Sequence, residues 1–299
     1  MKNHRKTEHS VTEKINPRTR DIDKYSPLKI IELISAEDSR IAEAVSKERK
    51  KIARAVDLIV KGLGGGGRLI FAGAGTSGRL GVLEASECPP TFGTDPSMVV
   101  GIVAGGKKAL WRSIEGAEDQ RKGSWDELNR LNLKKVDTVV GISASSATPF
   151  VEGALKYARL RGCGRILISC HPVQDTSIAG VFICPVVGPE VVMGSTRMKA
   201  GTATKMVLNM LTTASMIRLG KTYGNLMVDV QPTSEKLKIR ARRIVMQILD
   251  INHQKAENLL SKSEWNVKVA VIMGSKGVSY KEAKEHLEKH KGFLRKALK

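Results

Sequence analysis

A turn rich in glycine and hydroxyl side chains separates two apolar segments near residue 75, and its composition suits an anion-binding site. The stretch GAGTSG, residues 73–78, follows a short apolar run and precedes a helix expected to begin near Arg79. Glycines let the backbone approach a bulky ligand, and the first amides of a helix favour negative charge. Thr76 and Ser77 add hydroxyl donors there. We expect a phosphate group to bind at Gly75, Thr76 and Ser77.

The same six residues also satisfy the dinucleotide-binding pattern G-x-G-x-x-G, but the rest of that fingerprint is missing. No acidic residue ends the second apolar run, where residues 103–106 read VAGG. A Walker A loop is excluded because no Gly-Lys-Ser/Thr follows the glycines. A turn this rich in hydroxyls suits a phosphomonoester better than a pyrophosphate.

A second turn of the same character follows another apolar run. The sequence SASSATP occupies residues 143–149, and its proline is placed as the first residue of a further helix. Ser143, Ser145 and Thr148 are the candidate contacts to the sugar that carries the phosphate. Hydroxyls at such places also serve as helix caps, which remains the alternative for each turn. Two such turns on one sheet favour a ligand site.

Short apolar runs predict strands that are buried on both faces. They are Leu69–Ala72, Val99–Val103, Thr138–Ile142, Ile166–Ser169 and Val181–Ile183. Helix-compatible segments separate most of them: Arg79–Glu87, a stretch around Lys108–Lys122, Pro149–Leu160 and a brief Asp175–Ala179. This alternation predicts an α/β fold, with helices on both faces of a parallel sheet and a ligand crevice at the carboxyl ends of the strands.

The flanking sequence predicts a polar arm and several helices. Residues 1–26 are polar and charged, so we expect an arm that packs extended on another part of the protein. The elements expected after it are a short helix over Leu28–Ile34, a cap at Ser35–Asp38, a longer helix ending at Gly64–Gly67, helices over Met198–Leu219 and Thr233–Leu249, and three short helices from Asn252 onward. We divide the chain into an arm with helices (1–50), a sheet domain (51–232) and a helical C-terminal region (233–299).

The composition narrows the possible partners. The 299 residues carry a formal net charge of +20, yet basic and acidic residues alternate at helical spacing, as over Glu43–Arg54 and Lys281–His290. That pattern is typical of solvated helix faces, so no nucleic-acid partner is expected, and the 4% of aromatic residues disfavours a base-stacking surface. A positive field would attract a phosphorylated metabolite.

Cysteine and histidine usage points to neither disulfides nor a metal site. Cys88, Cys163, Cys170 and Cys184 form no C-x-x-C pair, so we expect reduced thiols in a cytoplasmic protein. His171 and the other histidines are expected to be satisfied side chains instead of ligands. We expect neither a signal peptide nor a membrane-spanning segment.

Several longer motifs occur in a fixed order around the two turns. GAGTSGRL is followed by LEASECPPTFG, AGG and EGAEDQ, and then by SAS-x-x-TPFV, GPEVVMGSTRMKAGTATKMVLNM and GNLMVDV. From Thr12 to the C-terminal helices, the chain thereby resembles the N-acetylmuramic acid 6-phosphate etherases, a branch of the sugar isomerase (SIS) proteins.

The resemblance implies a homodimer with a flavodoxin-like, three-layer SIS domain, working without a metal or organic cofactor. The family cleaves the D-lactyl ether of N-acetylmuramic acid 6-phosphate and gives N-acetylglucosamine 6-phosphate and D-lactate in cell-wall recycling. Its acid and base are glutamates in S-E-C-P-P and E-G-A-E-D, which match Glu87 and Glu118. By this resemblance, Glu118 removes the C2 proton and Glu87 protonates the departing lactate.

Taken without the resemblance, these glutamates are not distinguished from their neighbours. Glu84, Glu87, Glu115 and Glu118 all fit ordinary solvated helix positions. The chemistry itself is sound, because the C2 hydrogen of an open-chain sugar is α to the C1 aldehyde and can be removed by a carboxylate. Which carboxyl stays protonated depends on burial that the sequence does not show.

One motif departs from the family pattern. Where the family has S-G-R-T-P, this chain has Ser145, Ser146, Ala147, Thr148 and a proline, which could alter contacts to the sugar or to the lactyl carboxylate. In the motif STRMK, Arg197 and Lys199 either meet the negative charges of the substrate or form structural ion pairs. A second class of function stays open: a regulator that binds a sugar phosphate without converting it, as the related glucokinase regulatory protein does.

Overall fold

The computed structural model describes residues 10–145, 148–173 and 176–299, and within them the chain forms two compact units. The sheet unit contains the described residues up to Ser86 together with Ser97–Thr212. The helical unit contains Glu87–Pro96 and Thr213–Lys299.

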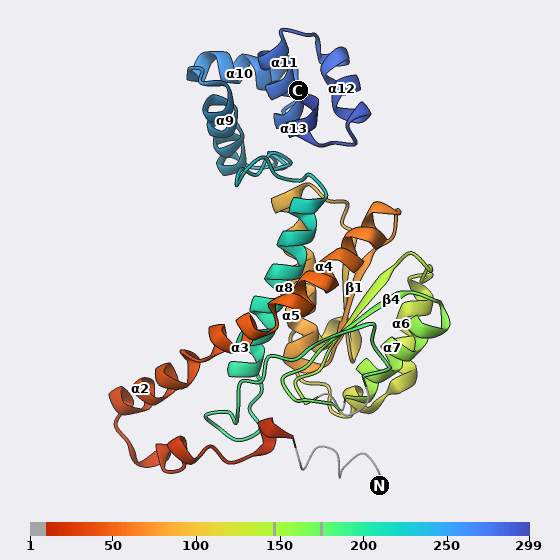
Figure 1. Ribbon diagram of the computed structural model, residues 1–299. Helices are drawn as coiled ribbons and strands as arrows, with labels where there is room; N and C mark the ends of the chain where they lie inside the picture. Colours follow the sequence, from red (N-terminus) through yellow and green to blue (C-terminus); the bar gives the residue numbers. More distant parts are fainter. Residues whose placement is uncertain (1–9, 146–147, 174–175) are drawn as a thin grey trace. The chain divides into compact units, whose positions relative to one another are not determined.

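The sheet unit is built on five parallel strands in the order β2-β1-β3-β4-β5 (Figure 1). Their bounds are β1 Leu69–Gly73, β2 Val99–Val103, β3 Thr138–Ile142, β4 Gly164–Ile168 and β5 Val181–Ile183. The predicted parallel α/β fold is confirmed. After β1 the chain adds β2 on one side and β3 on the other, so the strand order reverses at β1 and β3, where ligands bind in doubly wound sheets.

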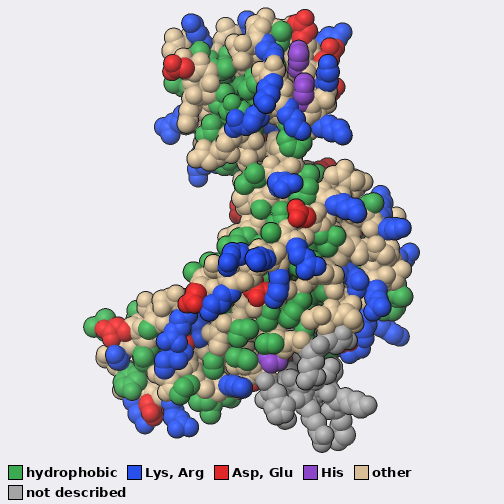
Figure 2. All heavy atoms as spheres, viewed as in Figure 1, with side chains coloured by type: hydrophobic (Ala, Val, Ile, Leu, Met, Phe, Trp, Pro, Cys, Tyr) green, Lys and Arg blue, Asp and Glu red, His purple; other side chains and the backbone are tan. Residues whose placement is uncertain are grey.

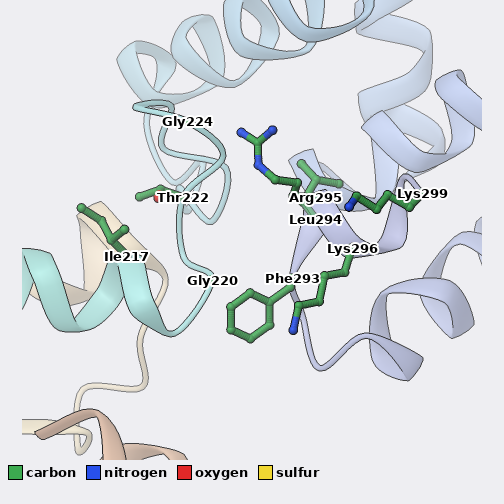
Figure 3. A pocket seen from close by; sticks show the side chains of 9 residues that line it. All are labelled: Ile217, Gly220, Thr222, Gly224, Phe293, Leu294, Arg295, Lys296 and Lys299. Atoms are coloured by element: carbon green, nitrogen blue, oxygen red, sulfur yellow. The ribbon is translucent and has the colours of Figure 1, made fainter. Parts of the chain in front are cut away.

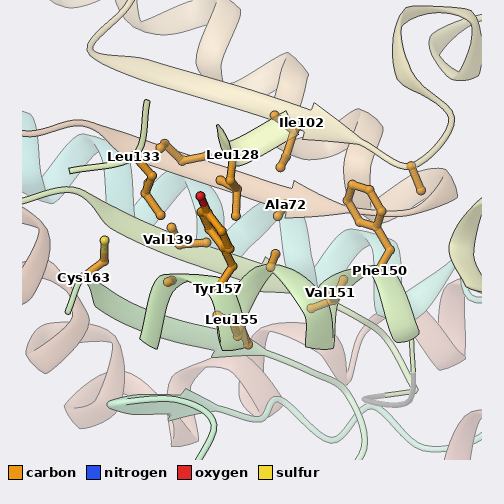
Figure 4. Packing of buried hydrophobic residues seen from close by; sticks show 14 of the residues in the cluster. Ala72, Ile102, Leu128, Leu133, Val139, Phe150, Val151, Leu155, Tyr157 and Cys163 are labelled. Carbon is orange, nitrogen blue, oxygen red and sulfur yellow. The ribbon is translucent and has the colours of Figure 1, made fainter. Parts of the chain in front are cut away.

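Helices cover both faces of this sheet. On one face, α6 (Arg121–Arg130) and α7 (Pro149–Leu160) pack against each other and cover Ile70, Ala72 and Val139 (Figure 4). A side chain at Gly141 would lie 2.7 Å from Val151, so this glycine lets α7 approach β3 closely. On the opposite face, α4 (Arg49–Gly64) contacts the strands.

Helix α5 begins earlier and ends later than the sequence predicted. It spans Gly75–Phe92, whereas Arg79–Glu87 was expected, and it contains Pro89 and Pro90. The hydroxyl side chains of the glycine turn therefore belong to the first helical turn. Gly78 allows this first turn to pack close to the end of β1, because a Cβ on Gly78 would lie 2.6 Å from the carbonyl oxygen of Gly73.

Three further predictions about helices were wrong: one predicted cap is helical, and two predicted helices do not form. Residues 35–38, expected to be a cap, lie inside α2 (Pro27–Asp38), whose cap is Ser26 accepting from the Lys29 amide. Between β2 and α6 the structure has short 3₁₀ turns, η4 (Gly106–Leu110) and η5 (Ala117–Asp119), in place of the helix expected around Lys108–Lys122, because glycines at positive φ interrupt the chain. Residues 176–179 are not helical, and Asp175 lies outside the described residues.

The described part of the polar arm packs on the sheet unit, but it contains three 3₁₀ turns where an extended course was predicted. Its 3₁₀ turns are η1 (Val11–Glu13), η2 (Pro17–Thr19) and η3 (Ile22–Lys24), and α3 (Ile41–Lys47) follows α2. Asn16 Nδ2 donates to the Pro189 carbonyl at 3.3 Å, and Thr19 Oγ1 donates to the Val191 carbonyl at 2.8 Å.

A buried ion-pair cluster joins this arm to α8 (Lys199–Arg218). The Lys199 ammonium is fully buried and donates to Glu37 at 2.5 Å, and Arg18 binds the same carboxylate from the arm. Glu190 accepts the amides of Lys199 and Ala200 at 3.0 and 2.9 Å. The sequence left open whether Lys199 meets the substrate or forms a structural ion pair, and in the structure it forms the ion pair.

The helical unit has its own apolar core, which includes Val245, Leu260 and Ile272. Its helices are α9 (Glu235–Leu249), α10 (His253–Lys262), α11 (Val267–Lys276), α12 (Tyr280–Lys289) and α13 (Leu294–Ala297), so four helices follow Asn252 where three were predicted. The buried Lys268 ammonium donates to the Gly220 carbonyl, the Asp229 carboxylate and the Gly292 carbonyl at 2.7–2.8 Å. Among the helices of the described ranges, none has the length and apolarity to cross a membrane.

Removing the carboxylate at the centre of the ion-pair cluster should strongly destabilise the protein. In Glu37→Gln the buried ammonium of Lys199 loses its counter-charge, and breaking a buried pair in this way costs about 3–5 kcal/mol. The matched control is Glu43→Gln, which removes an exposed pair with Lys47 and should leave the stability nearly unchanged. Urea unfolding measures both, and equal losses for the two variants would contradict the assignment.

The same cluster predicts acid sensitivity. The Arg18 guanidinium, followed by Lys199, lowers the pKa of Glu37 to about 2, whereas an unfolded chain has about 4.3. Because the folded pKa is the lower one, the stability from this group is present above the unfolded value and is lost as the pH falls through about 2. We expect the free-energy gap between wild type and Glu37→Gln to shrink between about pH 6 and pH 2.5. A gap that stays constant would argue against this pairing.

Candidate functional site

Three strand ends lie level at the carboxyl edge of the sheet. In the parallel register, Gly73 of β1 pairs with Val103 of β2 and with Ile142 of β3. The Ala104 amide continues the ladder by donating to the Gly73 carbonyl at 3.0 Å. The glycine turn and the second hydroxyl turn therefore start from neighbouring strands, at the point where the strand order reverses.

The glycine turn presents the start of α5 to solvent. Gly75 is exposed and has φ +53°, and nothing lies within 4 Å of the position a Cβ would take. The first backbone bond of the helix runs from the Gly78 amide to the Ala74 carbonyl at 3.3 Å. The amides of Gly75, Thr76 and Ser77 precede it and have no acceptor within the helix, as at any helix N-terminus. Together with two half-buried hydroxyl side chains, they can hold a phosphate group.

In the second turn, the hydroxyls of Ser143 and Thr148 lie 2.8 Å apart and share a hydrogen bond. Thr148 is the N-cap residue of α7, but its side chain makes no cap hydrogen bond. The simple capping alternative therefore does not describe this residue. Ser145 is half-buried, whereas Ser146 and Ala147, which replace the glycine and arginine of the family pattern, lie outside the described residues.

The structure separates the four glutamates that the sequence could not distinguish. Glu84 is buried and binds Lys205 and Thr212, and Glu115 accepts from Ser113 at 2.8 Å. Glu87 and Glu118 are both exposed, and neither carboxyl forms a hydrogen bond or ion pair with the described residues. Glu118 lies in η5 of the sheet unit, and Glu87 lies in the part of α5 that belongs to the helical unit.

His171 and the cysteines are not part of the predicted site. His171 accepts a hydrogen bond from the Val11 amide at its Nδ1 atom, and burial lowers the pKa of this histidine. All four cysteines are buried and none forms a disulfide in the described part of the chain, and burial raises the pKa of the Cys170 and Cys184 thiols to about 12. These thiols are poor nucleophiles at neutral pH, because the thiolate is the reactive form.

Basic side chains are spread over the face of the molecule that Figure 2 shows. Figure 2 shows lysine and arginine side chains scattered over the visible face of both units, with hydrophobic side chains between them.

Arg197 is exposed and forms no ion pair within the described part of the chain, so it remains available to an anionic ligand. Sequence reasoning gave no role to Arg79, which bonds to two backbone carbonyls of the loop that follows β2.

The helical unit contains a separate pocket of about 380 Å³ between the segment after α8 and the last helix (Figure 3). It is lined by Ile217, Gly220, Thr222, Gly224, Phe293, Leu294, Arg295, Lys296 and Lys299. Two of its cations lie over aromatic rings, Arg295 over Tyr223 and Lys296 over Phe293. None of the predicted site residues lines this pocket.

Comparisons with known proteins first define the class. Residues 50–159 match the family model of the glucokinase regulatory protein N-terminal SIS domain, in agreement with the parallel sheet and its ligand edge. The sheet unit is thus a SIS domain.

Full-length relatives then define the family. The N-acetylmuramic acid 6-phosphate etherase 2 of Vibrio cholerae serotype O1 is 51% identical over 97% of this chain and 95% of its own. The N-acetylmuramic acid 6-phosphate etherases of Rhodopirellula baltica and Clostridium botulinum are 51% and 50% identical, covering 96% and 97% of this chain and 95% and 96% of theirs. The chain belongs to the N-acetylmuramic acid 6-phosphate etherase family, and the resemblance drawn from its motifs is confirmed.

If the start of α5 binds phosphate, the loss of one hydroxyl there should weaken binding. In Ser77→Ala we expect a roughly tenfold or greater rise in the Kd for inorganic phosphate, because a hydrogen bond to a charged group contributes about 1.5–3 kcal/mol. Ser86→Ala is the matched control on the same helix, since that hydroxyl donates only to the Leu83 carbonyl at 2.7 Å. Phosphate-dependent shifts in Tm report the binding. Equal shifts for the two variants would remove Ser77 from the site.

Proposed function

We propose that this protein cleaves the D-lactyl ether of N-acetylmuramic acid 6-phosphate and releases N-acetylglucosamine 6-phosphate and D-lactate. The observation that carries the proposal is about half-identity to named etherases over nearly the whole chain. The two hydroxyl turns at the reversal point of the sheet support it, because they offer donors for a phosphorylated sugar at one edge.

In this proposal the substrate is anchored at both turns. Gly75, Thr76 and Ser77 bind the phosphate, because helix amides and hydroxyls combine there with a backbone that leaves space for an anion. The second turn, with Ser143, Ser145 and Thr148, contacts the sugar. The hydroxyl bond between Ser143 and Thr148 keeps two of these groups in a defined orientation.

Glu118 and Glu87, whose carboxyls have no partner among the described residues, carry out the proton transfers. Glu118 removes the C2 proton of the open-chain aldehyde, whose carbonyl takes up the electron pair as an enolate. The C3–oxygen bond then breaks, and Glu87 gives a proton to the departing lactate oxygen. Water adds across the resulting C2–C3 double bond, with its oxygen on C3 and a proton on C2. Because the C1 carbonyl itself accepts the negative charge, none of these steps requires a cofactor.

A homodimer in the cytoplasm completes the proposal. Four buried cysteines that form no disulfide among the described residues agree with a reducing compartment. The arm and α2 carry large exposed apolar side chains, Ile15, Tyr25, Leu28 and Ile31, of the kind that subunit contacts bury. Light scattering of the purified protein measures the mass, and a monomer at micromolar concentration would exclude the dimer.

The second candidate is a regulator that binds a sugar phosphate without converting it. The comparisons favour the etherase over this alternative, because about half-identity to named etherases covers nearly the whole chain, whereas the match to the SIS domain of glucokinase regulatory protein covers residues 50–159. Incubation with N-acetylmuramic acid 6-phosphate separates the two functions: the etherase releases lactate, whereas a regulator binds the compound and releases none.

Substitution of either proposed catalytic glutamate should reduce lactate release by about 10²–10⁴-fold, the usual contribution of a positioned acid or base. Glu118→Gln should also abolish exchange of the C2 hydrogen with deuterated solvent, whereas Glu87→Gln should retain it. Glu115→Gln is the control, because that carboxyl lies in the same loop and is held by Ser113. Retained C2 exchange in Glu118→Gln would take the role of base away from Glu118.

A further inference from the structure

The loop that carries Glu118 lies between β2 and α6 and is composed of two short 3₁₀ turns and irregular segments. Its side chains are largely exposed, and Trp111 at its centre is 85% exposed. A general base must stay within hydrogen-bonding reach of the proton that it removes. The loop therefore needs contacts that fix its position relative to the rest of the sheet unit.

Apolar packing holds the loop near its two ends. A Cβ on Gly105 would lie 3.0 Å from Ile114, so the loop folds closely on itself there. Ala117, next to Glu118, is buried in the core cluster under α6 and α7. The middle of the loop has a different support, which is polar and comes from α5.

Arg79 supplies that support. Its Nε atom donates to the Ala109 carbonyl at 2.9 Å and its Nη2 atom donates to the Arg112 carbonyl at 3.2 Å. The guanidinium group thus reaches both sides of Trp111, in a fork that a lysine ammonium cannot reproduce. Arg79 stands four residues after Gly75, so the same helix offers the phosphate-binding amides and grips the loop of the base.

The charge of Arg79 is not neutralised within the sheet unit. Both acceptors are neutral carbonyls, and no described carboxylate forms an ion pair with it. Two roles follow from these contacts, a mechanical one through the carbonyls and an electrostatic one toward the phosphate. The geometry favours the first, because the two bonds aim the guanidinium group at the loop.

We propose that Arg79 is a positioning residue that ties the 105–119 loop to the start of α5 and so keeps Glu118 in register with the anchored sugar phosphate. This inference rests on the proposed function of Glu118 as the base. It assigns no direct contact between Arg79 and the reacting atoms.

The test compares Arg79→Lys with Arg112→Lys. Both changes keep the charge, but the Arg112 side chain makes no hydrogen bond within the described residues, so only the first removes the fork. For Arg79→Lys we expect kcat for lactate release to fall on the order of 100-fold, because small displacements of a catalytic group have effects of this size. KM should stay within about threefold, since the anchor amides and the positive charge remain. C2 exchange should slow in parallel with lactate release.

Amide hydrogen exchange, followed by mass spectrometry on peptides covering 105–119, gives an independent readout. Exchange of this loop should accelerate in Arg79→Lys and stay unchanged in Arg112→Lys, while the Tm and the exchange of the remaining peptides of both variants resemble wild type.

Unchanged exchange of the loop in Arg79→Lys, or faster exchange with an unchanged kcat, would overturn the proposal. The variant Arg79→Gln, which removes the charge, tests the electrostatic role. If its KM rises while kcat and the exchange of the loop stay normal, Arg79 acts as a phosphate-binding cation and the positioning role is overturned. If the wild type releases no lactate, the proposed function fails, and the loop exchange still decides whether Arg79 ties the loop.

Discussion

The level pairing of Gly73 with Val103 and Ile142 is the constraint on which the candidate site depends. It brings the ends of three parallel strands to one edge, and each end leads into a segment with a proposed role: the phosphate turn, the loop of the base and the second hydroxyl turn. Glycine at 73 and 78 makes this arrangement possible, because any side chain there would collide with the backbone of the turn. A shift of one strand by one residue would turn its side chains to the opposite face and separate these segments.

A second constraint acts at a distance from the substrate. The start of α8 is held by Glu190 through two amides and by Glu37 through the Lys199 ammonium, and the arm closes over this cluster with Arg18. Thr76 lies close to the same helix, because a Cβ on Gly201 would be 3.5 Å from its methyl group. The buried charges of Glu37, Glu190 and Lys199 thereby support the wall against which the phosphate turn packs.

Much of the fold and part of the site could be predicted from the sequence, for identifiable reasons. The strands were readable because continuous apolar runs between turns are typical of parallel sheets, and the two hydroxyl turns were visible as motifs. The start of α5 was placed too late because a local pattern does not show that Gly78 packs on Gly73. Glu84 and Glu87 occupy one helix three residues apart, so only the positions of Lys205 and Thr212 in space could identify Glu84 as a structural residue. The contacts of Arg79 with carbonyls thirty residues away leave no trace in a pattern.

The buried ammonium of Lys268 has a consequence for shortening this chain. It uses all three of its protons on the Gly220 carbonyl, the Asp229 carboxylate and the Gly292 carbonyl, which come from three separate stretches of the helical unit. Deleting the residues from Gly292 onward would therefore do more than shorten a tail. It would leave the buried ammonium with one hydrogen-bond acceptor fewer and loosen the loop at Gly220. A truncation meant to isolate the sheet unit would therefore have to remove this lysine and its whole helix as well.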